Sequence, residues 1–209
     1  MTTGGPPVVV LACSAGGLDA LHRVLGPLPA DFGAAVVVLQ HQRPIRHSRL
    51  APVLARWTRL PVRDAVSGDA LKPGVVLVVP PGQHALATPE GTLALVTTDA
   101  TPPYRPSADL LLATLAITAG PRVVAVILSG LGHDGATGAN VVHDFGGTVL
   151  ASDRATSAHF AMPEAAISRD DAVNRVLPVD DIPAALVEIV DDRPDPVTDA
   201  PPEAVPEAP

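Results

Sequence analysis

The chain has 209 residues and a net charge of −8, a length that suits one domain with a full hydrophobic core. No apolar run reaches the roughly 18 residues that span a bilayer, and no basic segment precedes the first apolar run. These features exclude a membrane-spanning helix and argue against a signal peptide. The single cysteine, Cys13, excludes an intrachain disulfide and fits a reducing compartment, so we expect a cytoplasmic protein.

Strand-like and helix-like segments alternate along most of the sequence, which is typical of an α/β fold. We expect a doubly wound, mainly parallel sheet flanked by helices, with a β-hairpin near 84–97 that turns at Glu90-Gly91. The expected strands are 7–13, 34–40, 61–66, 75–79, 122–128 and 148–152. The expected helices are 16–25, 48–57, 108–119, 136–145 and 182–190, with one more helix starting at Met162-Pro163.

The last segment of the chain, 191–209, differs in composition from the rest. It holds six acidic residues, one arginine and six prolines. A Pro-rich acidic segment without apolar periodicity cannot offset the entropy that it would lose on ordering. We therefore predict one folded domain over 1–190 and a disordered acidic tail over 191–209.

Three of the expected strands lead into residues of a possible hydrolytic triad. The first leads into Ser14, the second into His41, and the fifth into the loop that holds Asp134. Because ligands bind beyond the carboxyl ends of the strands in an open parallel sheet, these side chains can converge although they are far apart in sequence. A nucleophile, a base and an orienting carboxylate are what acyl transfer needs, in any order along the chain.

Each of these residues also has a simpler interpretation. Ser14 precedes a Gly-Gly helix start and fits an N-cap or a phosphate contact, His41 fits a strand-end side chain bonded to backbone, and Asp134 fits a helix N-cap. Cys13 is a rival nucleophile by chemistry, but at the end of a buried strand we expect an inert apolar filler. The sequence lacks G-x-G-x-x-G and G-x-x-x-x-G-K-[ST], and its seven histidines show no metal-ligand spacing. Neither a nucleotide site nor a metal site is expected.

A basic segment follows His41 directly. Residues 41–63 contain six arginines and no acidic residue. A solvated helix face accounts for such a segment, and so does a surface that steers an anionic partner to the site. The residues that we single out for docking are Arg43, Arg46 and Arg49. Nucleic acid is a poor candidate for the partner, because the chain is acidic overall, has one lysine and lacks interleaved aromatic residues.

Five short elements of the sequence match, in order, the motifs of one family. They are Ala12–Gly17 for a turn written G-A-S-[TA]-G-G, Gln40-His41 after the second strand, Arg105–Asp109 for R-P-S-x-D, Leu128–Gly138 for L-[ST]-G-M-G-x-D-G-A-x-G, and Phe160–Pro163 for F-x-M-P. Through them the sequence resembles the catalytic domain of CheB-type protein-glutamate methylesterases over nearly its whole body. Each match alone is a modest signal, but five in the same order are specific.

The resemblance implies a role for each candidate residue. Ser14 would be the nucleophile, His41 the general base and then acid, and Asp134 the orienting carboxylate. The backbone amides of Leu131 and Ala15 would stabilise the tetrahedral oxyanion. The implied reaction hydrolyses glutamate γ-methyl esters on bacterial chemoreceptor helices, with glutamine deamidation as a further activity. No metal or organic cofactor is implied, and the implied partners are methylated cytoplasmic receptor helices, with no nucleic acid and no membrane insertion.

The sequence also departs from the family's motifs. Ala15 stands where Thr is common, Gln42 replaces a usual Met after the histidine, and Leu131 replaces another Met. These changes keep the three triad residues but bear on the choice of substrate. Because the first expected strand begins within ten residues of Met1, we also expect no N-terminal receiver domain. Two alternatives stay open: a non-catalytic signalling or docking module of the same fold, and an esterase for a different ester.

Overall fold

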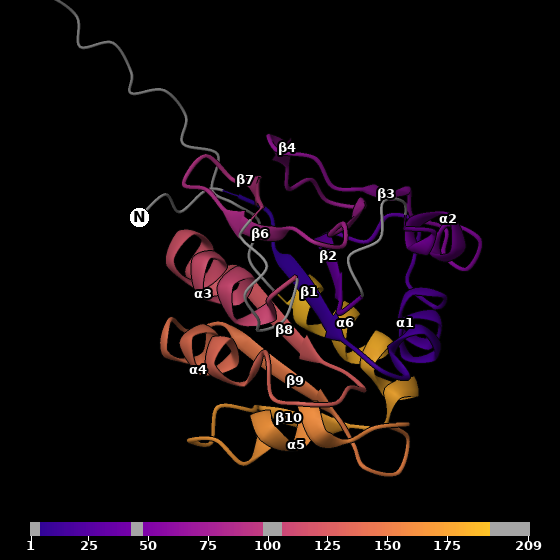
Figure 1. Ribbon diagram of the computed structural model, residues 1–209, viewed down its shortest axis with the longest axis vertical. Helices are drawn as coiled ribbons and strands as arrows, with labels where there is room; N and C mark the ends of the chain where they lie inside the picture. Colours follow the sequence, from indigo (N-terminus) through magenta and orange to yellow (C-terminus); the bar gives the residue numbers. More distant parts are fainter. Residues whose placement is uncertain (1–4, 43–47, 98–105, 193–209) are drawn as a thin grey trace, which may run out of the picture.

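The computed structural model describes residues 5–42, 48–97 and 106–192. Its centre is a seven-stranded sheet in the order β10-β9-β8-β1-β2-β5-β3, in which every pairing is parallel (Figure 1). The strands of this sheet are β1 (Val8–Cys13), β2 (Ala35–Gln40), β3 (Val62–Asp64), β5 (Val76–Val78), β8 (Val123–Ile127), β9 (Thr148–Ser152) and β10 (Arg175–Leu177). The helices are α1 (Gly17–Leu25), α2 (Leu50–Leu54), α3 (Ala108–Ala119), α4 (Ala136–Asp144), α5 (Ala161–Ile167) and α6 (Ile182–Asp191). The predicted fold class is confirmed.

Helices cover both faces of the sheet, and alternate residues of each strand enter two different hydrophobic cores. In β1, the side chains of Val10 and Ala12 face the core that α3, α4 and α5 cover, whereas Leu11 and Cys13 face the core that α1, α2 and α6 cover. Figure 1 shows α3 and α4 on one side of the strands and α1 and α6 on the other. The continuous apolar runs of the strands follow from this burial on both faces.

The central strand, β1, lies between β2 and β8, two strands that are far apart in the sequence. Cys13 at the end of β1 pairs with Gln40 of β2, and Ala12 pairs with Ile127 of β8. The chain thus continues from β1 to one side of the sheet and later returns to its other side. A crevice opens beyond the carboxyl ends of the strands at such a reversal of strand order. The segments that follow β1, β2 and β8 therefore meet at one place.

A small antiparallel sheet packs against α3. It contains β4 (Asp69–Ala70), β7 (Thr92–Val96) and β6 (His84–Ala87) in that order. The Ala87 amide donates a hydrogen bond to Thr114 Oγ1 on α3 at 3.0 Å. Strands β6 and β7 form the hairpin predicted near 84–97, and Gly91 takes the left-handed conformation at its turn, with φ of 74°.

Three elements differ from their predictions. Helix α2 has five residues rather than the ten expected over 48–57, because the amides of Arg56 and Trp57 bond to carbonyls only three residues back and tighten the chain into turns. Strands β4 and β10 are not predicted at all, since two and three residues are too few to show a period of two. Within the three described stretches, no helix is long and apolar enough to cross a membrane.

Candidate active site

Ser14 follows β1 directly and opens a tight turn into α1. The Gly17 amide donates to the Ser14 carbonyl oxygen at 3.0 Å. Gly16, the third residue of this turn, has φ of 73° and ψ of −5°, as a type II turn requires. A Cβ atom at Gly16 would lie 2.7 Å from the Cβ atom of Ala158, so the position needs glycine for space as well as for conformation. The turn places Ser14 at the carboxyl end of the central strand, where the sequence predicts it.

Cys13, the rival nucleophile, is fully buried among the apolar side chains that face α1. A Cβ atom at Gly17 would lie only 2.4 Å from the Cys13 sulfur, so the thiol fills the space beside this glycine. Burial raises the pKa of the Cys13 thiol far above its ordinary value, because the thiolate would lose its hydration. The inert filler predicted from the sequence fits this environment.

His41 follows β2 directly, beside the strand that leads to Ser14. Its amide donates to the Cys13 carbonyl oxygen at 3.0 Å. Its ring Nε2 lies 2.8 Å from Asp134 Oδ2, although 93 residues separate the two in sequence. The His41 side chain is 9% exposed and that of Asp134 is 3% exposed. The sheet thus brings the predicted base and the predicted orienting carboxylate into a contact that is almost fully buried.

Asp134 accepts hydrogen bonds from four groups. These donors are His41 Nε2 at 2.8 Å, Ser107 Oγ at 3.0 Å, the Ala108 amide at 2.6 Å and the Asp109 amide at 3.2 Å. Burial alone would raise the pKa of Asp134, but the bonds from His41 and from the two amides outweigh it and lower that pKa below its ordinary value. The amides belong to the first turn of α3, where the helix dipole also favours a negative charge. Asp134 is therefore held as a carboxylate.

The simpler interpretation of Asp134, an N-cap of the helix that follows it, does not describe this arrangement. The N-cap of α4 is Gly135, with no side-chain cap bond, and Asp134 instead binds the start of α3. The converse contact also exists, because Asp109 on α3 accepts from the amides of Gly135 and Gly138 at 2.9 and 2.7 Å. Asp134 thus binds the N-terminus of α3 while Asp109 binds the N-terminus of α4, which fixes the two helices relative to each other.

The two aspartates differ in their charge balance. Burial raises the pKa of Asp109, and the nearby charge of Asp134 raises it further, more than the bonds from Gly138 and Gly135 lower it. Asp134 receives the histidine contact and Asp109 does not. The pair therefore separates into one carboxylate held ionised next to His41 and one that is easier to protonate.

Three residues that we did not single out for the site contribute to it. Ser107 caps α3 by accepting from the Leu110 amide at 3.4 Å, and it also donates to Asp134. Asp109 holds the loop before α4. Ser129 bonds to the Ser14 turn. Periodicity gives no signal for these polar contacts, but all three residues lie inside the motifs R-P-S-x-D and L-[ST]-G-M-G.

The remaining predicted residues are placed as follows. Ala15 lies inside the turn after Ser14, and Leu131 lies in the loop after β8 and is 56% exposed. Their assignment to an oxyanion site stays a prediction. Arg49 is exposed just before α2, and Arg43 and Arg46 fall outside the described residues. Over 5–42, 48–97 and 106–192, no group of three or more His, Cys, Asp or Glu residues could hold a metal ion.

Comparison with known proteins identifies the family. The family model described as CheB methylesterase matches residues 9–186, nearly the whole described chain. The chain belongs to this family. A solved structure, the CheB methylesterase catalytic domain of Thermotoga maritima, superposes with a TM-score of 0.83 at 35% sequence identity, covering 89% of this chain and 100% of that domain. The resemblance inferred from the five motifs is confirmed.

Curated relatives of the chain are named as protein-glutamate methylesterases. A protein-glutamate methylesterase/protein-glutamine glutaminase 2 of Anaeromyxobacter dehalogenans is 46% identical over 182 residues, which cover 87% of this chain and 53% of that protein. A protein-glutamate methylesterase/protein-glutamine glutaminase of Moorella thermoacetica is 40% identical over 190 residues, covering 89% and 45%. The protein-glutamate methylesterase FrzG of Myxococcus xanthus is 38% identical over 185 residues, covering 88% and 55%. The chain spans about half of the length of these relatives.

Proposed function

We propose that this CheB-family chain is a serine methylesterase that hydrolyses glutamate γ-methyl esters on the cytoplasmic helices of chemoreceptors or similar sensor proteins. The observation that carries the proposal is the buried contact between His41 and Asp134 beside the turn that presents Ser14. The names of the relatives support the substrate class. In this proposal Ser14 is the nucleophile, His41 the general base and Asp134 the orienting carboxylate.

Acylation would begin at Ser14. Its Oγ attacks the ester carbonyl carbon while His41 accepts the hydroxyl proton, and the carbonyl π electrons move onto the oxygen. Because Asp134 engages Nε2, the proton goes to Nδ1 of His41. The imidazolium that forms then faces the ionised Asp134, whose lowered pKa keeps it a carboxylate at neutral pH. Collapse of the tetrahedral intermediate breaks the bond to the methoxy oxygen, which takes the proton from His41 and leaves as methanol.

Deacylation would repeat these steps with water. His41 accepts a proton from a water molecule as the water oxygen attacks the acyl carbon, and the second tetrahedral intermediate expels Ser14 Oγ, which regains its proton from His41. The products are a free glutamate side chain and the regenerated serine. With a glutamine side chain the first leaving group is ammonia instead of methanol, so the same groups account for a glutaminase activity.

Negative charge develops on the substrate oxygen in both intermediates. Backbone amides near the nucleophile stabilise such an oxyanion when they are fixed in advance. The amides of Ala15 and Leu131 are the donors that we assign to this role, since one follows Ser14 and the other lies in the loop after β8. A backbone contact of this kind survives the replacement of the family's usual Met by Leu131.

The basic segment after β2 gives the substrate a docking surface in this proposal. A helix that presents several glutamates is negatively charged wherever they are not methylated. Arg49 is exposed, and Ser48 in front of it bonds to Gln42, the neighbour of His41, at 3.2 Å. An anionic helix held there would extend from the candidate active site, and the attraction would weaken with salt.

Reversal of one charge tests this docking. Arg49→Glu is expected to raise KM for a methylated receptor fragment several-fold with kcat nearly unchanged, because the contact is made equally in the ground state and the transition state. Arg169→Glu, an exposed arginine outside the basic segment, is the matched control for net charge. An unchanged KM in Arg49→Glu, or an equal rise in both variants, would remove the docking role.

The function itself is tested by methanol release from methylated receptor fragments. The wild-type chain is expected to release methanol, and Ser14→Ala is expected to lose about 10⁴- to 10⁶-fold in rate, as removal of a triad nucleophile does. Activity toward p-nitrophenyl acetate without activity toward the methylated fragment would replace the substrate by another ester. Binding of the fragment without turnover of either substrate would indicate a docking module.

A further inference from the structure

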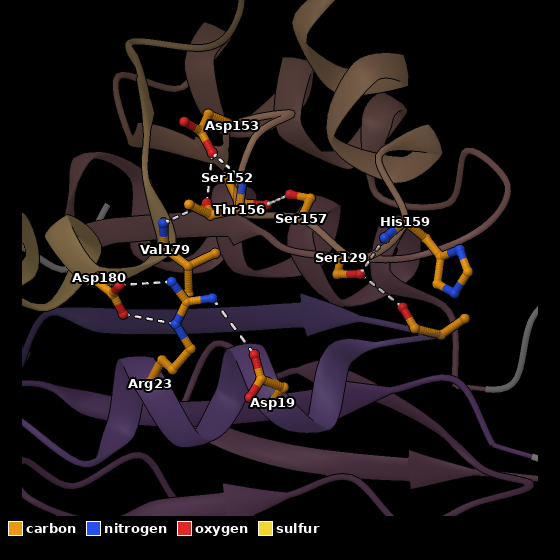
Figure 2. A network of polar contacts seen from close by, with 11 residues as sticks. Asp19, Arg23, Ser129, Ser152, Asp153, Thr156, Ser157, His159, Val179 and Asp180 are labelled. Carbon is orange, nitrogen blue, oxygen red and sulfur yellow. Dashed lines mark hydrogen bonds and ion pairs between the residues drawn. The ribbon is translucent and has the colours of Figure 1, made fainter.

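Ser129, the second residue after β8, is buried at 1% exposure and uses two of its atoms to bond to the nucleophile turn, Ser14–Gly17. Its carbonyl oxygen accepts from the Ser14 amide at 2.9 Å, and its Oγ donates to the Ala15 carbonyl oxygen at 2.8 Å. The His159 amide donates to the same Oγ at 3.0 Å. Figure 2 shows Ser129 between the His159 nitrogen and the carbonyl oxygen that it binds. Because an amide can only donate, the hydroxyl proton of Ser129 is directed to Ala15.

This bond selects one of two orientations of the peptide between Ala15 and Gly16. Type I and type II turns differ mainly by a flip of their central peptide, and the φ of 73° at Gly16 identifies the type II form here. In that form the Ala15 carbonyl points to the buried Ser129. Since the C=O and N–H of a trans peptide point in opposite directions, the Gly16 N–H points away from the buried Ser129, and Gly16 itself is exposed.

Gly16 and Ser129 complement each other in space as well. A Cβ atom at Gly16 would lie 2.7 Å from Ser129 Oγ, so the hydroxyl occupies the volume that any side chain at Gly16 would take. The left-handed glycine permits the flipped peptide, and the serine hydroxyl holds it. Neither contact involves His41 or Asp134, so the catalytic contacts already described do not account for them.

We propose that the Gly16 amide is an oxyanion donor of the site and that Ser129 is the positioning residue that holds this amide in its outward orientation. The inference rests on the proposed esterase function and adds a donor to the two amides assigned there. In this inference the Ser129 hydroxyl is needed to stabilise the transition state, because it holds the Gly16 amide in place. It is not needed to bind the substrate.

The test compares two buried serines. Ser129→Ala removes the hydroxyl that holds the peptide. Ser152→Ala is the matched control, because Ser152 is also fully buried and its hydroxyl bonds to Ser157 at 2.7 Å, away from the nucleophile turn (Figure 2). For each variant, kcat and KM are measured with the methylated receptor fragment and with p-nitrophenyl acetate. The dissociation constant of butylboronic acid is measured in parallel, because it forms a tetrahedral adduct on a catalytic serine.

Ser129→Ala is expected to lower kcat about 10- to 100-fold on either ester with KM within about twofold, because the donor is misoriented rather than removed. It is expected to weaken the binding of butylboronic acid by a similar factor. Ser152→Ala is expected to keep kcat, KM and this dissociation constant within about threefold of the wild type. The inference is overturned if Ser129→Ala keeps its kcat, if KM rises by as much as kcat falls, or if Ser152→Ala loses as much.

The outcome for the proposed function is read separately. If the wild type cleaves p-nitrophenyl acetate but releases no methanol from the fragment, the proposed substrate fails, and the serine comparison on the activated ester still decides the role of Ser129. If the wild type cleaves neither ester and does not bind butylboronic acid, both the esterase function and the oxyanion role are overturned.

Discussion

The two ends of the central sheet differ in how they use polar residues. Five buried polar side chains lie in the described part of the chain, and four of them bond at the carboxyl end of the sheet: Ser107, Ser129, Asp134 and Ser152. The fifth, His84, accepts from the amide of Ser107. All five side chains are hydrogen-bonded. A buried polar group without such a bond would destabilise the fold.

A cavity lies at the amino end of the sheet. It measures about 430 Å³ and lies between α3, the small sheet and the start of β1. Among its lining residues, Glu90 is exposed, and Arg122 is half-buried and donates to the Pro6 carbonyl oxygen at 3.2 Å. Burial lowers the pKa of this Arg122 guanidinium. The buried, hydrogen-bonded polar groups lie at the carboxyl end instead, and the motifs of the sequence lie there too.

The largest effect that separates the two ends is expected from Asp134→Asn. The Ala108 amide and His41 Nε2 share Oδ2 of Asp134, so the asparagine oxygen would take that place and its NH₂ group would face the Ser107 hydroxyl. The contact with His41 is kept but its negative charge is lost, so the imidazolium that forms during acyl transfer is no longer stabilised by a carboxylate. We expect methanol release to fall about 10³- to 10⁴-fold.

Asp180→Asn is the control for this variant. Asp180 is exposed and bonds to Arg23 with two oxygens at 2.7 Å, on the side of the molecule that α1 covers (Figure 2). It should leave methanol release within about twofold of the wild type, as expected for an exposed ion pair outside the site. A loss in Asp180→Asn comparable to that in Asp134→Asn would mean that the effect is not specific to the His41 contact.

A smaller effect is expected from Ser107→Ala. The variant keeps the other three donors of Asp134 and loses one hydroxyl, together with the cap of α3. We expect methanol release to fall up to about tenfold and the free energy of unfolding to fall by about 1 kcal/mol, as for loss of an N-cap. Thr118→Val, on the same helix but lining the amino-end cavity, should keep full activity. If both variants lost activity equally, α3 as a whole rather than its first turn would be responsible.

The two aspartates should respond to pH with opposite signs. The lowered pKa of Asp134 means that it stabilises the fold above its unfolded value of about 3.9 and that this contribution is lost as pH falls through the folded pKa. The raised pKa of Asp109 means the reverse: stability is lost as pH rises from about 3.9 through the folded pKa.

Asp109→Asn isolates the second of these contributions. An asparagine oxygen can still accept from Gly135 and Gly138, so the packing of α4 is kept while the charge is removed. Relative to the wild type, the variant should become more stable as pH rises from about 4 to 7, and urea unfolding at the two pH values measures the change. A difference that does not depend on pH would show that Asp109 titrates as in the unfolded chain.

The smallest effect is expected at the amino end. Arg122→Gln should keep methanol release within about twofold and cost about 1 kcal/mol or less in the free energy of unfolding, because one hydrogen bond to a backbone carbonyl is lost. A tenfold loss of activity in this variant would couple the cavity to the site and break the contrast between the two ends.

The sequence predicts most of the strands well, because buried parallel strands are continuous apolar runs, and three of these runs lead into Ser14, His41 and the loop of Asp134. It does not predict which helix Asp134 binds, since the partner amides at Ala108 and Asp109 are about 25 residues away and follow from how α3 and α4 pack. It also does not predict which ring nitrogen of His41 faces the carboxylate. The five motifs contain residues that make such contacts, among them Asp109 and Ser129, but the motifs do not show which partners these residues bind.

The central claim, that the groups at the carboxyl end of the sheet activate Ser14 as a nucleophile, is tested most directly by covalent labelling. The chain is treated with a fluorophosphonate, and the modified residue is located by peptide mass spectrometry, with Asp134→Asn treated in parallel. We expect one phosphonyl group on Ser14, none on Cys13, and much slower labelling of Asp134→Asn. Absence of labelling at Ser14, or equal rates in the wild type and in Asp134→Asn, would contradict the account.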